Sequence, residues 1–268
     1  MPEGNTVWLA ARSLRSALAQ RQLVTAELRI LDLVTTDLTG DSVVDVVARG
    51  KHLLIRLGSE RTLHNHLRMD GSWRVQPSDR AVIDPHDHVR VVLGNDDATA
   101  LGYRVHDLAL VPTTDEGSLV GHLGPDLLGA DWDATEAARR LAADKDRSVG
   151  EALLDQRNLA GIGNIFKAEI CFLRGLSPWT PMGDVGDIDG LVNLAHRVLA
   201  ANRERYDHVT TGDSRPGRRT WVYGREGKPC SRCGTTVRVE WQGDPPRLSY
   251  WCPRCQPGPT PPTGRAAR

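Results

Sequence analysis

The sequence has no long hydrophobic run. No stretch of about 18 apolar residues occurs in its 268 residues, and the first residues contain no extended apolar segment. These absences argue against a membrane-spanning helix and against a cleavable secretory signal. We therefore expect a cytoplasmic protein.

The sequence also has no net charge, because 34 Lys and Arg residues balance 34 Asp and Glu residues. The overall balance therefore gives no sign of a nucleic-acid partner, but its distribution does. Residues 203–268 carry 13 basic and 6 acidic residues, a surplus of +7, whereas the rest of the chain has 21 basic and 28 acidic residues, or −7. A basic C-terminal quarter indicates a local phosphate-binding face.

Cysteine is scarce outside one short segment. Four of the five cysteines lie between Cys230 and Cys255, and the fifth, Cys171, stands in the apolar helical context EICFL. We interpret Cys171 as a small buried hydrophobic residue rather than a nucleophile. A chain of this length can bury sufficient cores without disulfides.

The clustered cysteines have the spacing of a metal site. Cys230 and Cys233 form one C-x2-C pair, and Cys252 and Cys255 form a second pair after eighteen intervening residues. Two such pairs can place four thiolates tetrahedrally around Zn²⁺. A redox pair or two disulfides is the alternative, which a cytoplasmic location disfavours. All four positions are occupied by protein ligands, so one structural zinc ion is predicted, holding a hairpin too small for its own core.

The order of elements predicts an α+β chain. Apolar residues in 6–18 follow one helix face, with Asn5 as a possible N-cap, and short β-branched runs then continue to about residue 125, most simply as a β-sandwich. Beyond this point helices are predicted at 135–143, from Ser148 onward with Glu151 as a capping-box partner, after the GIG of 161–163, and at about 188–206. No internal repeat is apparent.

Four motifs together resemble one protein family. The motifs are the N-terminal PEG, RGKHLL, LLDQRNLAGIGNIFKAEI, and VYGREGKPCSRCG followed by YWCPRCQ. Their order and their intervals resemble those of the formamidopyrimidine-DNA glycosylase and endonuclease VIII (Fpg/Nei) family. The resemblance covers residues 1 to about 256. It implies an N-terminal helix with a β-sandwich, a helix-two-turns-helix domain and a zinc finger. The expected divisions are a catalytic domain at 1–125, a DNA-binding domain at 126–222, the finger at 223–256 and a disordered tail at 257–268.

The resemblance implies a catalytic role for the first two residues after methionine. Removal of Met1 would expose the secondary amine of Pro2, which attacks deoxyribose C1′ and forms an iminium ion, while Glu3 donates a proton to the ring oxygen. An α-amino group titrates near neutrality, at about 7.7 to 8.0, and so needs little further activation. Without the resemblance, Pro2 would only permit methionine removal and Glu3 would be a surface charge.

The resemblance also assigns DNA-contacting residues. Lys51 contacts the phosphate beside the lesion and assists β-elimination, and Arg247 grips a phosphate and assists δ-elimination. Asn164 binds a phosphate at a helix N-terminus, and Met69 fills the gap left when the damaged base is flipped out. The alternatives are surface residues for Lys51 and Arg247, an ordinary N-cap for Asn164 and a core methionine for Met69. The pairs His64/His66 and His86/His88 are expected to support loops near DNA rather than a second metal.

Three departures from the family pattern distinguish branches within it. First, Asn5 and Thr6 stand where many members have Pro and Glu. Second, the stretch LGYRVHDLALV lacks the Arg-Phe pair with which formamidopyrimidine glycosylases help to fill the gap in the DNA. Third, the connector before the finger is too short for the loop that those enzymes fold over 8-oxoguanine. The last two favour the endonuclease VIII branch, whose substrates are oxidised pyrimidines. The expected protein is thus a monomeric, nucleoid-associated DNA glycosylase and AP lyase. The alternative is a non-catalytic zinc-finger protein that binds damaged DNA.

Overall fold

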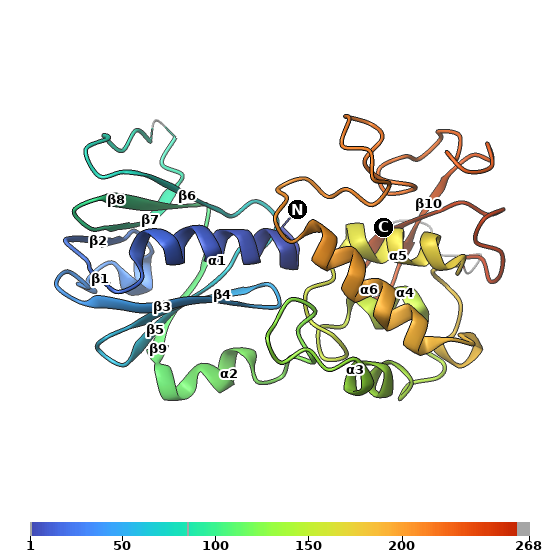
Figure 1. The fold of residues 1–268 in the computed structure, drawn as a ribbon, viewed down its shortest axis with the longest axis horizontal. Coiled ribbons are helices and arrows are strands. Elements are labelled where there is room, and N and C mark those ends of the chain that lie inside the picture. The colour runs from blue at the N-terminus through green and yellow to red at the C-terminus, as the bar shows by residue number, and fades with distance from the viewer. Residues whose placement is uncertain (1, 85, 262–268) are drawn as a thin grey trace. The chain divides into compact units, whose positions relative to one another are not determined.

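The computed structural model describes residues 2–84 and 86–261, which form two compact units divided between His122 and Leu123. Figure 1 shows the elements of both. Each unit is described separately below. The finer division of residues 126–256 into two domains stays a prediction, and residues 262–268 of the expected tail lie outside the described residues.

The first unit consists of helix α1 and two antiparallel sheets. The five-stranded sheet has the order β1-β3-β4-β5-β9, and the four-stranded sheet has the order β2-β7-β8-β6. The elements are α1 (Gly4–Leu18), β1 (Arg21–Gln22), β2 (Thr25–Leu28), η1 (Leu31–Leu33), β3 (Ser42–Arg49), β4 (His52–Leu57), β5 (Arg61–His66), β6 (Ser72–Pro77), β7 (Val89–Gly94), β8 (Ala98–Tyr103), β9 (Asp107–Pro112), η2 (Thr113–Asp115) and α2 (Glu116–Val120).

Helix α1 completes the core of this unit. It contacts β3 and β4 of one sheet and β6 and β8 of the other, as Figure 1 shows. Its apolar face, with Val7, Leu14 and Leu18 fully buried, packs against residues from both sheets. Burial of one such side chain contributes about 1.5 to 3 kcal/mol. This packing holds the start of α1 in place, and the start of α1 carries Pro2 and Glu3.

The second unit is helical and ends in a hairpin. Its elements are α3 (Ala134–Leu141), α4 (Val149–Leu154), α5 (Asn164–Arg174), η3 (Met182–Asp184), α6 (Ile188–Asn202), β10 (Arg238–Gln242) and β11 (Arg247–Trp251). Buried side chains of the four helices, Phe166 among them, form one core. A smaller core joins Phe172 of α5 to Val222, Val237 and the finger cysteines.

Most expected elements are present, and the differences have local causes. Helix α6 ends at Asn202, before the expected residue 206. The Asn202 amide donates to the carbonyls of Val198 and Val209 and accepts from Val209 N–H, which folds the chain back. Strand β9 was not predicted individually, although it lies within the segment that was expected to be β-rich. It is a half-buried edge strand, and its structure depends on pairing with β5.

The prediction that Asn5 is the N-cap of the first helix is wrong. Glu3 is the N-cap of α1, and Asn5 lies within the first turn of the helix, fully buried. At the other predicted cap, Ser148 is the N-cap of α4, but its hydroxyl donates to Glu151 Oε2 at 2.5 Å instead of accepting a backbone N–H. The burial expected of Cys171 is confirmed, and burial raises the pKa of its thiol to about 12.

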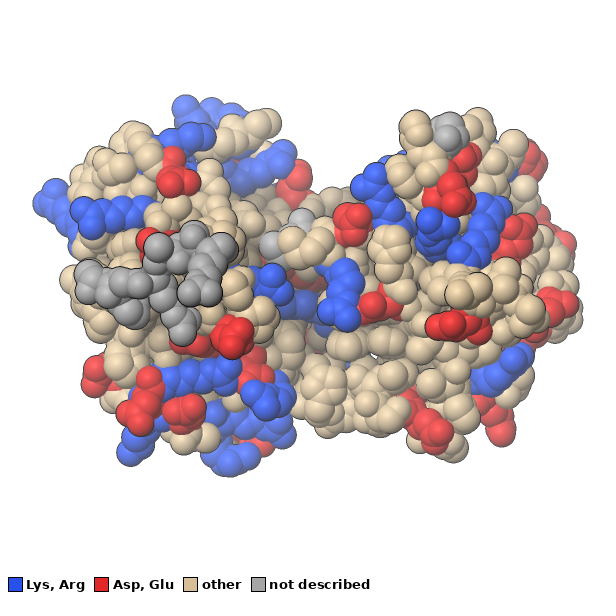
Figure 2. Space-filling model, turned by 180° about the vertical axis from the view of Figure 1, so that it is seen from behind, with Lys and Arg blue, Asp and Glu red and all other residues tan. Residues whose placement is uncertain are grey.

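Acidic and basic side chains are intermingled on the face of the molecule drawn in Figure 2, in keeping with the zero net charge. Among the described residues, no helix combines the length and hydropathy needed to cross a membrane.

Candidate active site and nucleic-acid-binding residues

The first turn of α1 fixes the carboxylate of Glu3. The Glu3 side chain accepts from the Thr6 backbone N–H, and the Glu3 backbone N–H donates to Thr6 Oγ1 at 3.5 Å, a reciprocal capping arrangement. Glu3 is fully buried, and Pro2 before it is half-buried. Thr6 thus serves the capping box at the position where many family members have Glu. A secondary amine beside a fixed carboxylate can supply a nucleophile and a proton donor.

Lys51 occupies the tight turn between β3 and β4. Arg49 pairs with His52 across the hairpin, so the turn consists of Gly50 and Lys51, and Gly50 has a φ of +59°. A left-handed residue in a two-residue hairpin turn favours glycine. The turn presents the half-buried Lys51 at the end of the five-stranded sheet.

Four histidines cluster beside Lys51. His52 Nδ1 lies 2.8 Å from His64 Nε2, and the His52 ring lies 5.0 Å from that of His66 and 6.2 Å from that of His122. Burial, followed by repulsion from the other histidines, lowers the pKa of His52 to about 3, and burial lowers that of His66 to about 4. The imidazoles of His52 and His66 are therefore neutral near pH 7. Sequence reasoning singled out His64 and His66 by their alternation but missed His52 and His122, which only folding brings near.

Met69 lies on the turn between β5 and β6 and is 57 % exposed. The alternative of a core methionine is therefore wrong. Large apolar side chains that remain exposed in a tight turn are available to contact another molecule.

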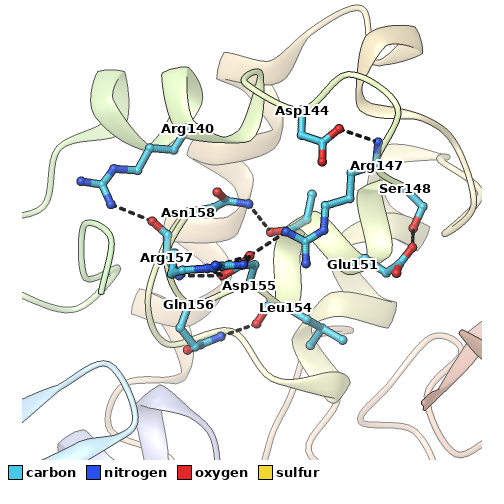
Figure 3. A network of polar contacts seen from close by, with 11 residues as sticks. Arg140, Asp144, Arg147, Ser148, Glu151, Leu154, Asp155, Gln156, Arg157 and Asn158 are labelled. Atoms are coloured by element: carbon cyan, nitrogen blue, oxygen red, sulfur yellow. Dashed lines mark hydrogen bonds and ion pairs between the residues drawn. The ribbon is translucent and has the colours of Figure 1, made fainter. Parts of the chain in front are cut away.

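In the second unit, a network of polar contacts shapes the loop between α4 and α5 (Figure 3). Asp155 accepts from Arg157 Nη2 at 2.7 Å and from Arg147 Nη1 at 2.6 Å, and these hydrogen bonds hold the pKa of its carboxyl well below the usual range. The Gln156 amide donates to the carbonyls of Leu154 and Ile162 and accepts from Gly161 N–H. The loop that leads to α5 is thereby ordered by its own side chains.

Asn164 and Arg247 are brought to one place. Asn164 is the first residue of α5, after the N-cap Gly163, and its Nδ2 donates to Leu248 O at 2.8 Å. The buried Lys167, one turn further along α5, donates to Ser249 Oγ at 2.6 Å. Helix α5 thus holds β11 of the hairpin. Arg247, at the start of β11, is exposed, and its guanidinium has no hydrogen bond or ion pair to any described residue.

Glu169 ties the segment before the finger to α5. Its buried carboxylate accepts from the consecutive backbone N–H groups of residues 221, 222 and 223 at 2.7 to 2.9 Å and from the Thr210 hydroxyl. Burial raises the pKa of this carboxyl, although the hydrogen bonds act in the opposite direction. Sequence reasoning did not single out this residue. The signal was an acidic residue among the apolar neighbours of IFKAEICF.

The four finger cysteines fit a tetrahedral metal. Their Sγ atoms all lie within 4.8 Å of one another, with Cys230 and Cys255 4.0 Å apart and Cys233 and Cys252 3.4 Å apart. A zinc–sulfur bond of about 2.3 Å implies sulfur separations of about 3.8 Å in a tetrahedron. Burial raises the pKa values of Cys252 and Cys255, whereas hydrogen bonds with Thr235 lower that of Cys233 to about 6. A bound cation favours the ionised form of such thiols. These cysteines can therefore bind a metal ion.

Comparison with known proteins identifies the family. Residues 1–106 match the model of the formamidopyrimidine-DNA glycosylase N-terminal domain, and residues 123–202 match that of the formamidopyrimidine-DNA glycosylase H2TH domain. A protein of Streptomyces coelicolor named probable endonuclease 8 2 is 53 % identical over 99 % of this chain and 98 % of its own length.

The chain belongs to the Fpg/Nei family.

Within this family, the endonuclease VIII branch is the better match. A Mycolicibacterium smegmatis protein named DNA-(apurinic or apyrimidinic site) lyase Nei2 is 45 % identical over 96 % of the chain and 99 % of its own length. A solved structure of Lactococcus lactis Fpg, in complex with DNA containing an abasic site, has the same fold. Its TM-score is 0.78 at 22 % identity, and the match covers 96 % of this chain and 100 % of that one.

Proposed function

We propose that this Fpg/Nei family member is a bifunctional DNA glycosylase and AP lyase of base excision repair, which removes oxidised bases and nicks the strand. The observation that carries the proposal is the start of α1. There Pro2 directly precedes Glu3, and the Glu3 carboxylate is buried and held by the first turn of the helix. A carboxylate that served only as a surface charge would not need to be buried and held by the helix in this way.

The glycosylase step uses both residues. Once Met1 is removed, the Pro2 nitrogen attacks C1′ of the damaged nucleotide while Glu3 protonates the sugar ring oxygen, so that the ring opens and the base departs. The nitrogen lone pair then forms an iminium ion with C1′. The capping contacts of Glu3 keep its carboxylate from swinging away from the helix start, which favours a fixed geometry for proton transfer.

The lyase steps follow from the iminium ion. It acidifies the C2′ proton, whose removal expels the 3′ phosphate by β-elimination, and δ-elimination then expels the 5′ phosphate. We assign Lys51 to the phosphate beside the lesion and Arg247 to the second elimination. The exposed guanidinium of Arg247, which has no partner among the described residues, supports a phosphate contact.

Damaged DNA is the proposed partner. Met69 would fill the gap left by the flipped base, and its exposure supports this role. Asn164 would contribute a phosphate contact at the start of α5, beside Arg247. We infer that oxidised pyrimidines are the preferred lesions, because the connector between α6 and the finger is compact: Thr210 N–H bonds to Arg219 O at 2.8 Å and closes it into a short loop.

We further propose that the finger cysteines hold one structural zinc ion. Zinc would supply no reactive position here, since Cys230, Cys233, Cys252 and Cys255 complete its tetrahedron. Its role would be to fold the hairpin that carries Arg247.

Borohydride trapping tests the function directly. Duplexes containing dihydrouracil, thymine glycol or an abasic site should each yield a covalent protein–DNA adduct when the iminium ion is reduced. An N-terminal extension that keeps Pro2 in a peptide bond should abolish the adduct, because an amide nitrogen is not nucleophilic. The same extension placed at the C-terminus is the control and should leave trapping unchanged. Failure of the unmodified protein to trap any of these duplexes would contradict the enzymatic proposal.

The non-catalytic alternative predicts a different result. A protein that only binds damaged DNA would show salt-dependent binding, with neither an adduct nor a nick.

A further inference from the structure

Two turns of the first unit are joined around Met69 by reciprocal ion pairs. The turn Leu67–Gly71 links β5 to β6, and the turn at residues 103–107 links β8 to β9. Arg68 of the first turn pairs with Asp107 at the end of the second. Arg104 of the second turn lies 3.7 Å from Asp70 of the first. Each turn therefore contributes one arginine and one aspartate to the other.

The backbone of both turns is held in unusual conformations. Arg68 and Arg104 each have a φ of +52°, which non-glycine residues rarely adopt. In the first turn, Gly71 N–H bonds to Leu67 O at 2.9 Å, and a Cβ at Gly71 would meet that oxygen at 2.5 Å. Strained residues of this kind persist only where surrounding contacts hold them, and they concentrate at functional sites.

A buried amide fixes the base of the two turns. Asn65 of β5 is 1 % exposed, and its Nδ2 donates to Asp107 O at 2.8 Å while its Oδ1 accepts from Trp73 Nε1 at 3.1 Å. Arg104 is held a second time, because its backbone N–H donates to His88 O at 2.8 Å and its guanidinium lies 3.3 Å from His88 Nε2. The pairing of β5 with β9 continues to His66 and Asp107. Met69, at the tip of the first turn, is 57 % exposed.

We propose that the two crossed ion pairs, Arg68–Asp107 and Arg104–Asp70, form a charge clasp. This clasp positions Met69 so that its side chain can enter the base stack as the damaged base is flipped out. This inference rests on the proposed function. Unstacking a base step costs a few kcal/mol. If the turn that carries Met69 were mobile, the stacked bases would push the side chain aside, and it would not displace the damaged base. Each exposed ion pair alone contributes little, but two crossed pairs above a buried amide restrict the turn together. Arg68 and Arg104 are then positioning residues.

An Asp107→Asn variant separates the clasp from a direct DNA contact. It breaks the pair with Arg68 but removes no positive charge and leaves the bond from Asn65 to the Asp107 backbone carbonyl. If Arg68 served only to bind phosphate, losing the nearby negative charge would leave lesion processing equal or faster. The clasp predicts the reverse, with single-turnover excision of dihydrouracil slowed about tenfold, which corresponds to about 1.4 kcal/mol in the activation barrier.

Preformed abasic sites provide the internal comparison. They contain no base to evert, so Asp107→Asn should cleave them within about twofold of the wild-type rate, which also shows that the variant is folded. Met69→Ala should also slow dihydrouracil excision, and the double variant should be no slower than Met69→Ala alone, because both changes remove one function. The matched control is Asp97→Asn, which removes an exposed pair with Arg21 at the opposite end of β8 and should excise normally.

Two outcomes would overturn the clasp. One is unchanged excision by Asp107→Asn, and the other is an equal loss on dihydrouracil and abasic substrates. Failure of the proposed function would look different, because the wild-type chain would then cleave neither substrate.

Discussion

At the scale of single residues, Thr6 is the position where this chain departs most informatively from its family. Many members have Glu at this position, whereas this chain has a hydroxyl side chain. In the structure, Thr6 closes a capping box with Glu3, so its hydroxyl and backbone N–H both contact the proposed proton donor. The residue types are reversed relative to the usual box, with the carboxylate at the N-cap and the hydroxyl three residues later.

Thr6→Val tests this capping contact. The change keeps the side-chain shape but removes the acceptor of the Glu3 N–H, so we expect a loss of about 1 kcal/mol in the free energy of unfolding, typical of a cap. Slower borohydride trapping on dihydrouracil should accompany it, since Glu3 is held less firmly. Ser13→Ala, on the exposed side of α1, is the control for a lost hydroxyl. Wild-type stability and trapping in Thr6→Val would show that the contact is unimportant.

At the scale of elements, the hairpin of β10 and β11 depends on neighbours for its structure. Strand β11 is held by Asn164 and Lys167 of α5, and Gln242 of β10 donates to Ser148 Oγ at 2.9 Å and to Pro178 O at 2.8 Å. Gly150 of α4 leaves the space for this, because a Cβ there would meet Gln242 Oε1 at 2.5 Å. The other end of the hairpin carries the cysteines and packs in the small core around them.

Metal removal should therefore unfold the hairpin selectively. The purified chain should contain about one zinc ion, and chelation should abolish trapping while most of the helical circular dichroism remains, because α3 to α6 have their own core. Cys233→Ser should lower the zinc content. Cys171→Ala, which removes a buried thiol outside the cluster, should leave the zinc content unchanged. Full trapping activity in a zinc-free chain would contradict the structural role.

At the scale of the whole molecule, the histidine cluster links stability to pH. Folding lowers the pKa of His52 to about 3 and that of His66 to about 4, chiefly by burial, whereas the unfolded value is about 6.5. The unfolded chain therefore binds more protons from about pH 6.5 down to about pH 4 for His66 and about pH 3 for His52. The contribution of these neutral histidines to the free energy of unfolding is therefore full above about pH 6.5. It is lost as the pH falls through this window.

Thermal unfolding as a function of pH checks this linkage. The unfolding midpoint should fall between about pH 6.5 and pH 4, and His52→Phe should make the fall shallower by removing one of the groups that folding keeps neutral. His106→Gln, which alters an exposed histidine of the same unit, should retain the wild-type slope. An identical slope in His52→Phe would show that His52 does not contribute.

Several features were predictable from local sequence patterns. The cysteine spacing predicted a four-thiol cluster, the period of the apolar residues predicted α1, and the GIG before Asn164 predicted the start of α5. Each depends on residues close in sequence or on a spacing imposed by a metal, so the chain's local geometry determines them. Motif order then identified the family, which the comparisons confirm.

The remaining features were decided only by the tertiary structure. These features are the N-cap at Glu3, the edge strand β9, the histidine cluster and the crossed ion pairs around Met69. They depend on residues that are distant in sequence or on residues whose local preference was weak. Asp107 and Arg68 are 39 positions apart, and no periodicity connects them. The sequence by itself therefore determined which chemistry the chain can perform. The packing of its two sheets determined how the turn bearing Met69 is held, because that turn is stabilised by contacts that exist only after β5 and β9 have paired.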